Sequence, residues 1–175
     1  YTRSLGPTLS AFMTGLAERR IFGARGSDGR VYVPPAEYDP VTAQPLTEMV
    51  EVADEGTVVS WTWVGEALPG QPFERPFAWA LVKLDGADTP LLHALDVGSS
   101  TDLSIGMRVQ VRWADSPVGS IHDIVCIVPA GSAPAASASP SRGSVETVQM
   151  ITTPVQLSVE HTASIEETHY LNALE

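Results

Sequence analysis

The chain has 175 residues, of which 43% are hydrophobic, so it is long and apolar enough to bury a core. Ten Lys and Arg against 21 Asp and Glu give a net charge of −11, which argues against a protein that binds the phosphate backbone of nucleic acids. No stretch approaches the roughly 18 apolar residues of a membrane span, and a single cysteine excludes an intrachain disulfide, which together predict a cytoplasmic protein.

The first predicted element is an amphipathic helix over residues 8–21, within an N-terminal segment of residues 1–23. Its apolar side chains recur at i, i+3, i+4 and i+7, as Leu9, Phe12, Met13 and Leu16. Residues 24–45 are rich in Gly, Pro and Asp, and they predict a loop-rich knuckle with one short strand over residues 30–33. The apolar face of the helix therefore needs another element to pack against.

From residue 46 the hydrophobic pattern has a period of two, which predicts β-strands. The predicted strands are Thr57–Val64, Phe77–Lys83, Leu91–Val97, Arg108–Trp113 and Ile121–Val128. The segment between the third and fourth strands, residues 99–106, leaves room only for a short helix or turn. Five strands at this spacing predict an OB-type barrel over residues 46–130, so the fold class is mainly β with flanking helices.

Aromatic residues alternate along the first two of these strands. The period of two places Val59 on one face with Trp61 and Trp63, and it places Phe77, Trp79 and Leu81 on one face of the next strand. Aromatic side chains on a basic groove could stack on bases. Because this chain is acidic, they predict instead a barrel core or a protein interface.

The C-terminal part predicts a linker and the start of a further module. Residues 131–147 are rich in Ala, Ser and Pro, and they lack the apolar content needed to fold. Residues 148–175 predict an extended arm followed by a helix that opens with a capping box from Ser164 to Glu167. The apolar residues of that helix repeat the spacing of Phe12, Met13 and Leu16, which indicates the first of two tandem modules.

The sequence holds few candidates for chemistry, and it has no nucleophile elbow, phosphate-binding loop or HExxH motif. Asp28 and Asp39 could bind a hard cation or serve as an acid–base pair, although Asp in such a loop usually bonds to its own backbone. His93 shares a face with apolar residues, which favours a half-buried histidine over a catalytic base. His122 and Asp123 precede the last strand and point to opposite faces, which disfavours a dyad.

Six motifs in order make the chain similar to the DUF35 family, in which a rubredoxin-like zinc ribbon precedes an OB-fold. They cover residues 8–130 and are Ile21–Arg25, Gly29–Pro35, Tyr38–Thr42, Gly56–Ser60, Pro76–Val82 and Ile105–Val111. Where the family has four zinc-binding cysteines, this chain has Arg25, Asp28, Asp39 and Thr42. Because zinc prefers thiolate and imidazole ligands, we expect no zinc, and we expect packing of residues 32–35 to hold the knuckle.

The resemblance implies a non-catalytic accessory subunit of a thiolase-superfamily enzyme that acts on acyl-CoA thioesters. The specific expectation is a lipid-transfer-type retro-aldolase of steroid side-chain degradation. CoA or the partner would be contacted by Arg30, Tyr32, Lys83, Arg108 and Arg112, although solvated strand faces are the alternative for these cations. Three other functions remain open: a free-standing acyl-CoA-binding module, an enzyme using Asp28, Asp39 or His93, and an OB-fold single-strand binder.

Overall fold

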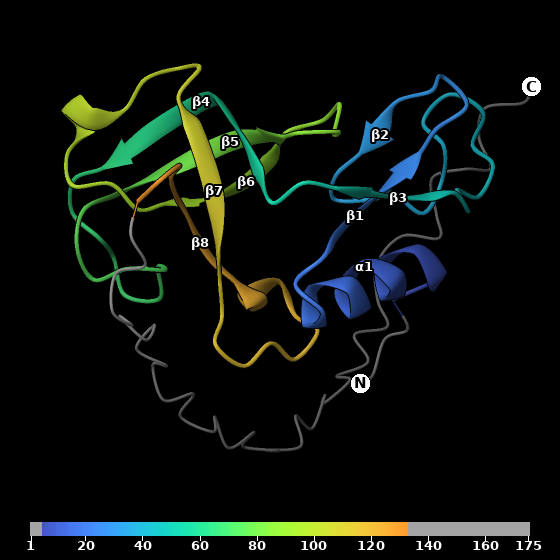
Figure 1. Cartoon of the computed structure of the whole chain (residues 1–175), viewed down its shortest axis with the longest axis horizontal. Coiled ribbons are helices and arrows are strands. Elements are labelled where there is room, and N and C mark those ends of the chain that lie inside the picture. The colour runs from blue at the N-terminus through green and yellow to red at the C-terminus, as the bar shows by residue number, and fades with distance from the viewer. Residues whose placement is uncertain (1–4, 133–175) are drawn as a thin grey trace, which may run out of the picture. The chain divides into compact units, whose positions relative to one another are not determined.

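The computed structural model describes residues 5–132, which form one small sheet, one barrel and one α-helix (Figure 1). Two 3₁₀ turns, η1 and η2, interrupt the barrel connections. The elements in chain order are α1 Pro7–Ala17, β1 Ile21–Arg25, β2 Val31–Tyr32, β3 Met49–Val52, β4 Glu55–Val64, β5 Phe77–Leu84, β6 Leu91–Leu95, η1 Ser100–Asp102, β7 Arg108–Trp113, η2 Ile121–Asp123 and β8 Ile124–Pro129. No helix in this range is long and apolar enough to cross a membrane.

The N-terminal helix is shorter than predicted, because the chain turns sharply after Ala17. Arg19 adopts a left-handed conformation with φ of 58°, and the backbone N–H of Arg20 donates to the carbonyl of Gly15 at 2.9 Å, which closes the helix end. The sequence analysis placed residues 21–23 in the N-terminal helical segment, but residues 21–25 form strand β1 instead. The predicted apolar face is confirmed, since Phe12 and Leu16 are buried.

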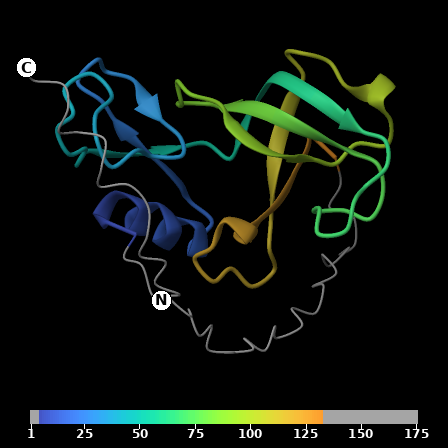
Figure 2. The same ribbon diagram turned by 180° about the vertical axis from the view of Figure 1, so that it is seen from behind.

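The small sheet has the strand order β2-β1-β3, and both pairs are antiparallel. It therefore extends beyond the predicted knuckle of residues 24–45 on both sides. The hairpin after β5 covers the free edge of β2: the N–H of Val31 donates to the Asp88 carboxylate at 2.9 Å, and Val33 N–H donates to the Thr89 hydroxyl at 2.7 Å. These bonds join the small sheet to the barrel, and Figure 2 shows the tip of this hairpin beside β2.

The barrel confirms the predicted OB-type fold, since its closed strand order is β4-β5-β6-β8-β7. All neighbouring strands are antiparallel except β6 and β8, as in the five-stranded Greek-key barrel. The predicted short connection between the third and fourth strands holds only the turn η1. The final predicted strand starts later, because residues 121–123 form η2 before β8 begins.

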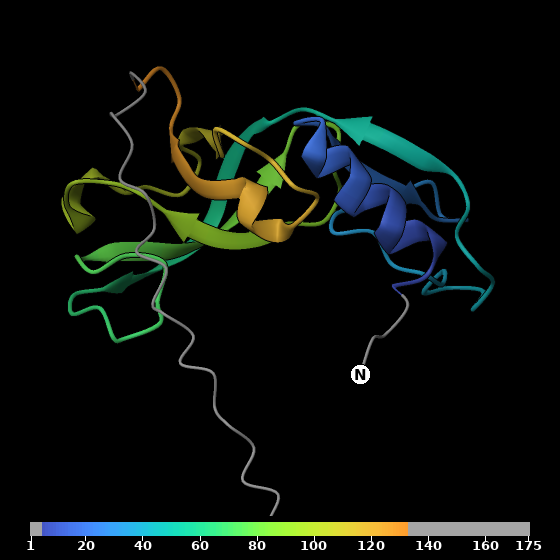
Figure 3. The ribbon, with the colours of Figure 1, turned by 90° about the horizontal axis from the view of Figure 1, so that it is seen from below.

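One hydrophobic core fills the barrel and continues under α1 and the small sheet. The helix supplies Phe12 and Leu16, while the barrel interior includes Val58, Leu95 and Ile127. The connection between β7 and β8 lies against α1, near η2 (Figure 3). The small sheet, helix and barrel are therefore parts of one packed body rather than separate modules.

A β-bulge in β4 overturns one predicted face. The register shifts between Val58 and Ser60, so Val58 faces the core and Val59 is 43% exposed. Beyond the bulge, Trp61 and Trp63 pack against the core. The period of two grouped Val59 with these two tryptophans, but the extra residue of the bulge places it on the opposite side. The predicted linker, arm and second module lie outside the described residues.

Candidate functional site

The four positions at which the resemblance places zinc ligands do not form a metal site. Asp39 is nearly fully buried, and its carboxylate accepts backbone N–H donors from Ser27 at 2.6 Å, Val41 at 2.7 Å and Thr42 at 3.2 Å. The N–H groups of Ser27 and Val41 lower the pKa of Asp39 to about 2. One carboxylate thus bridges the two loops that four thiolates and a metal would otherwise join.

The other ligand positions are used in different ways. The Asp28 carboxylate accepts the N–H of Arg30 at 3.0 Å and the hydroxyl of Tyr32 at 2.9 Å, and this last bond raises the pKa of Tyr32. Arg25 pairs with Glu48 at 2.8 Å. Thr42 supplies only its backbone N–H to the carboxylate bridge. No hydrogen bond or ion pair among the described residues joins the side chains of two of these four positions.

A zinc ion therefore does not fit this knuckle. Across residues 5–132 no group of three or more His, Cys, Asp or Glu is arranged to hold a metal. Packing of the Val33 and Pro35 side chains contributes, as predicted, since both are buried, but Pro34 is exposed. The sequence predicted that packing of residues 32–35 alone would hold the knuckle. It did not predict the role of the Asp39 carboxylate, which joins the two loops.

The residues predicted to contact CoA or the partner lie at separate places on the chain's surface. The charges of most of them are balanced by nearby carboxylates. Arg108 binds Asp85 through both Nη atoms, at 2.8 and 2.6 Å, and it lies 3.4 Å from Glu55. Arg30 lies 3.8 Å from Asp28 at the knuckle, where Tyr32 also binds. The structure brings Arg30 and Tyr32 together at Asp28, and it places Lys83 and Arg108 on the two sides of Thr57.

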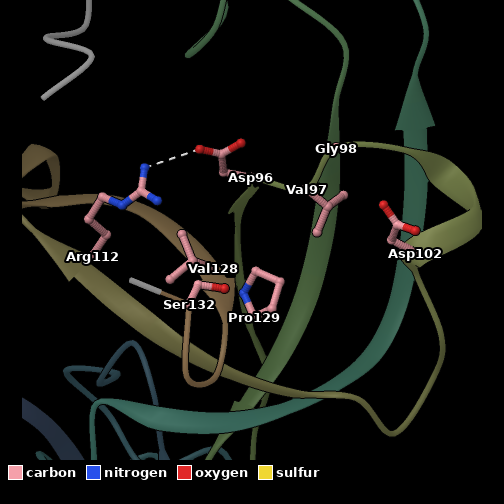
Figure 4. A pocket seen from close by; sticks show the side chains of 8 residues that line it. All are labelled: Asp96, Val97, Gly98, Asp102, Arg112, Val128, Pro129 and Ser132. Atoms are coloured by element: carbon pink, nitrogen blue, oxygen red, sulfur yellow. Dashed lines mark hydrogen bonds and ion pairs between the residues drawn. The ribbon is translucent and has the colours of Figure 1, made fainter. Parts of the chain in front are cut away.

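Arg112 lies in a separate pocket of about 260 Å³ between the ends of β6 and β8 (Figure 4). Its Nη1 donates to Asp96 at 3.1 Å, and Arg75 binds the other oxygen of Asp96 at 2.6 Å. Asp102 adds a second carboxylate to the lining. Because Asp96 is shared by two guanidinium groups and Asp102 is acidic, this pocket has no excess positive charge to attract a phosphate.

Lys83 differs from these arginines, because within residues 5–132 its ammonium makes no ion pair. It is exposed on β5, where it pairs across the strands with Thr57. Thr57 in turn accepts a hydrogen bond from Arg108, whose charge is already balanced by Asp85 and Glu55. Lys83 lines a surface pocket together with Asp85 and Asp88, so carboxylates lie near its ammonium although none is paired with it.

The histidines and the buried acid do not form a catalytic set. His93 lies on β6 facing the barrel interior, its Nδ1 is buried without a partner, and burial lowers its pKa. Burial would raise the pKa of Asp123, but backbone N–H donors from Ser120, Val118 and Gly119 outweigh it and lower the pKa. His122 is exposed, so the predicted absence of a dyad agrees with the geometry.

Cys126 is an inert thiol, as its position in an apolar run predicts. It is fully buried on β8, and burial raises its pKa to about 11. Almost none of it is thiolate near neutral pH, so it offers neither a nucleophile nor a metal ligand.

The aromatic side chains divide between the two faces of the barrel wall. Trp61 and Trp63 pack against the core, whereas Phe77 and Trp79 point to the opposite side of β5 from Ala78 and Ala80, where Phe77 is fully buried and Trp79 is half-buried. Phe77 is covered by Phe73, with 5.5 Å between their ring centroids, and it meets Trp79 edge-on at 5.5 Å. The predicted core role is confirmed for Trp61 and Trp63, and the alternative role in a protein interface stays a prediction.

The fold defines the class of protein: an OB-fold domain preceded by a helix and a small sheet. Residues 49–114 match the family model for the C-terminal OB-fold domain of ChsH2. A protein of unknown function from the DUF35 family of Sulfolobus solfataricus is 25% identical, with a TM-score of 0.51, over 61% of this chain and 77% of the other. No curated protein matches the sequence.

A second structural neighbour is described as the Ltp2-ChsH2(DUF35) aldolase. It is 23% identical, with a TM-score of 0.55, and the match covers 74% of this chain and 99% of the other. This likeness shows the shared fold. The matched OB-fold domain and the DUF35 neighbour make the chain similar to DUF35 proteins, in agreement with its six sequence motifs.

Proposed function

We propose that the chain is a non-catalytic accessory subunit of a thiolase-superfamily enzyme that acts on acyl-CoA thioesters. The specific assignment is a retro-aldolase, a carbon–carbon lyase, of steroid side-chain degradation. The observation that carries the proposal is the match to the Ltp2-ChsH2(DUF35) aldolase, which extends over 99% of that neighbour's chain. The chain thus shares its fold with nearly the whole of a protein described as the Ltp2-ChsH2(DUF35) aldolase, which supports the proposal.

The chemistry of the described residues supports a role without catalysis. The carboxylates of Asp28 and Asp39 are occupied by hydrogen bonds that shape the knuckle, and His93 faces the barrel interior. Catalysis of a retro-aldol cleavage needs a base that reaches the substrate hydroxyl. In the part of the chain that the structure describes, no such base lies beside a second catalytic group, so the partner would supply the reactive side chains.

The proposal is tested by co-producing the full chain with the thiolase-fold subunit encoded in the same genome. We expect a stable complex by size-exclusion chromatography with light scattering, and faster cleavage of a β-hydroxyacyl-CoA substrate than by the partner alone. Calorimetry with CoA esters on the isolated chain is the companion measurement, since binding without a partner would favour a free-standing module. A chain that stays monomeric and leaves the partner's rate unchanged would contradict the proposal.

A further inference from the structure

Strands β6 and β8 close the barrel through its shortest strand pairing. They run parallel with a single register position, Leu95 with Ile127, and the Asp96 N–H donates to the Ile127 carbonyl at 2.8 Å. The neighbouring pairs β5–β6 and β7–β8 each have five register positions. We call Leu95, Asp96 and Ile127 the β6–β8 junction. Because separating two strands costs the hydrogen bonds between them, the barrel opens most readily at this junction.

His93 lies two residues before this junction, on the face of β6 that points into the barrel. It pairs across the strands with Ala80, and it shares its face with Leu91 and Leu95; all three of these neighbours are buried. The Nδ1 atom of His93 is buried and has no hydrogen-bond partner in the described structure. An imidazolium needs an acceptor for each ring N–H, and these apolar side chains cannot supply one. The site therefore suits the neutral ring and opposes the protonated one.

The surroundings of His93 act on its charge in three ways. Burial lowers the pKa of His93, the backbone of Ala94 raises it, and the charge of His122 on η2 lowers it further. His122 is exposed, so it takes up a proton without hindrance and then repels a second positive charge on His93. Acidification therefore places two like charges beside the β6–β8 junction.

The other titratable groups of the surrounding elements do not compensate this charge. On β5 the titratable side chain is Lys83 and on β8 it is Cys126; each alternates with an interior residue, so each points away from the buried imidazole. Asp96 is bound by two arginines, and Asp123 accepts three backbone N–H groups. Helix α1 carries no titratable side chain. Within residues 5–132 no carboxylate acts on the pKa of the buried imidazole.

We infer that His93 makes the β6–β8 junction an acid-sensitive opening point of the barrel. When the imidazole takes up a proton, β6 separates from β8, and water reaches the ring and the interior beside Leu95. Because the pKa of His93 in the closed barrel is lowered from 6.5, the closed form is fully stabilised above pH 6.5 and loses stability as pH falls toward the lowered pKa. This inference goes beyond the proposed function and does not depend on it.

The test is amide hydrogen exchange of the full chain, followed by NMR at about pH 7.5 and 5.5 and corrected for the intrinsic exchange rate. One proton taken up on opening raises the open population by at most about tenfold between these values, so we expect the protection of the Asp96 amide to fall several-fold. That protection should also stay below the protection of the amides in the β4–β5 ladder, which exchange on global unfolding.

Two variants assign the effect to one ring. His93→Gln keeps a polar side chain that cannot be protonated in this range, so the Asp96 amide should be equally protected at both pH values. His122→Gln is the matched control, because it removes the exposed imidazole and leaves the buried one, and the fall in protection should persist. A fall of the same size in His93→Gln would overturn the inference.

Two measurements on the wild type complete the test. If the Asp96 amide exchanges at the same rate as the β4–β5 ladder at both pH values, the barrel opens only as a whole and the role of the junction is overturned. NMR titration of the His93 ring should give a midpoint below 6.5. A midpoint at or above 6.5 would overturn the inference, even where His93→Gln fails to fold.

Discussion

Replacing Asp39 by Asn tests whether one carboxylate takes the place of a zinc site. The native carboxylate accepts three backbone N–H groups from two loops. An amide keeps one acceptor oxygen and turns an NH₂ group toward the remaining donors, so the knuckle loses part of its bridge. We expect Asp39→Asn to lower the unfolding midpoint at pH 7, and we expect a chelator to leave the wild-type midpoint unchanged.

The magnitude follows from the pKa of Asp39, which is lowered from 3.8 to about 2. Because the pKa is depressed in the folded chain, the stabilisation is complete above pH 3.8 and is lost as pH falls through 2. At about pH 3 roughly nine in ten folded chains keep the carboxylate, whereas roughly one in seven unfolded chains does. Unfolding at that pH therefore takes up about 0.8 proton at Asp39.

The assay is chemical denaturation between about pH 2.5 and 3.5, because the slope of unfolding free energy against pH counts the protons taken up. Near pH 3 the wild type should take up about 0.8 proton more on unfolding than Asp39→Asn does. Asp115→Asn is the control, since that exposed carboxylate accepts no hydrogen bond in the described structure. Equal slopes for wild type and Asp39→Asn, or a wild type that unfolds on chelation, would refute the carboxylate bridge.

Three further predictions concern the scaffold. Asp123→Ala removes the acceptor of three backbone N–H groups and should cost about 1–3 kcal/mol in chemical denaturation, whereas an unchanged midpoint would show that water replaces the bonds. Leu16→Ala leaves a cavity where α1 meets the core and should cost about 2–5 kcal/mol by the same measurement; a loss below about 1 kcal/mol would contradict the shared core. Cys126 should resist a thiol reagent at about pH 8 until the chain is denatured, because its pKa is raised to about 11. Rapid labelling of the folded chain would contradict its burial.

Local patterns predicted the elements but not all their ends. The alternation along residues 108–113 predicted strand β7 with its observed bounds, and Phe12 and Leu16 were correctly assigned to the buried face of the helix. The helix end was missed because it depends on a left-handed Arg19, a residue type that gives no turn signal. A Gly or Asn at that position would have marked the stop.

The candidate site was less predictable, because its contacts join residues distant in the chain. Asp39 was recognised as a position that lacks a zinc ligand, but its bridge to Ser27 spans 12 residues and has no sequence signal. The sequence showed that the cations near the barrel are isolated along the chain. It did not show their counter-ions, because these come from distant residues: Arg108 and Glu55 are 53 residues apart. Of the cations predicted to contact CoA or the partner, only Lys83 makes no ion pair within residues 5–132.

The sequence by itself determined the acidic charge, the positions of the strands along the chain and the absence of cysteine ligands. Composition and periodicity can be read from the residues without knowing which of them meet in space. The tertiary structure decided which faces those residues occupy. The bulge at Val58 and Ser60 rotates Val59 outward, and the pairing of three strands aligns it with Leu81 and Leu92. A shift of one residue reverses every side chain in a strand, so this row of apolar side chains exists only because of the register that folding selects.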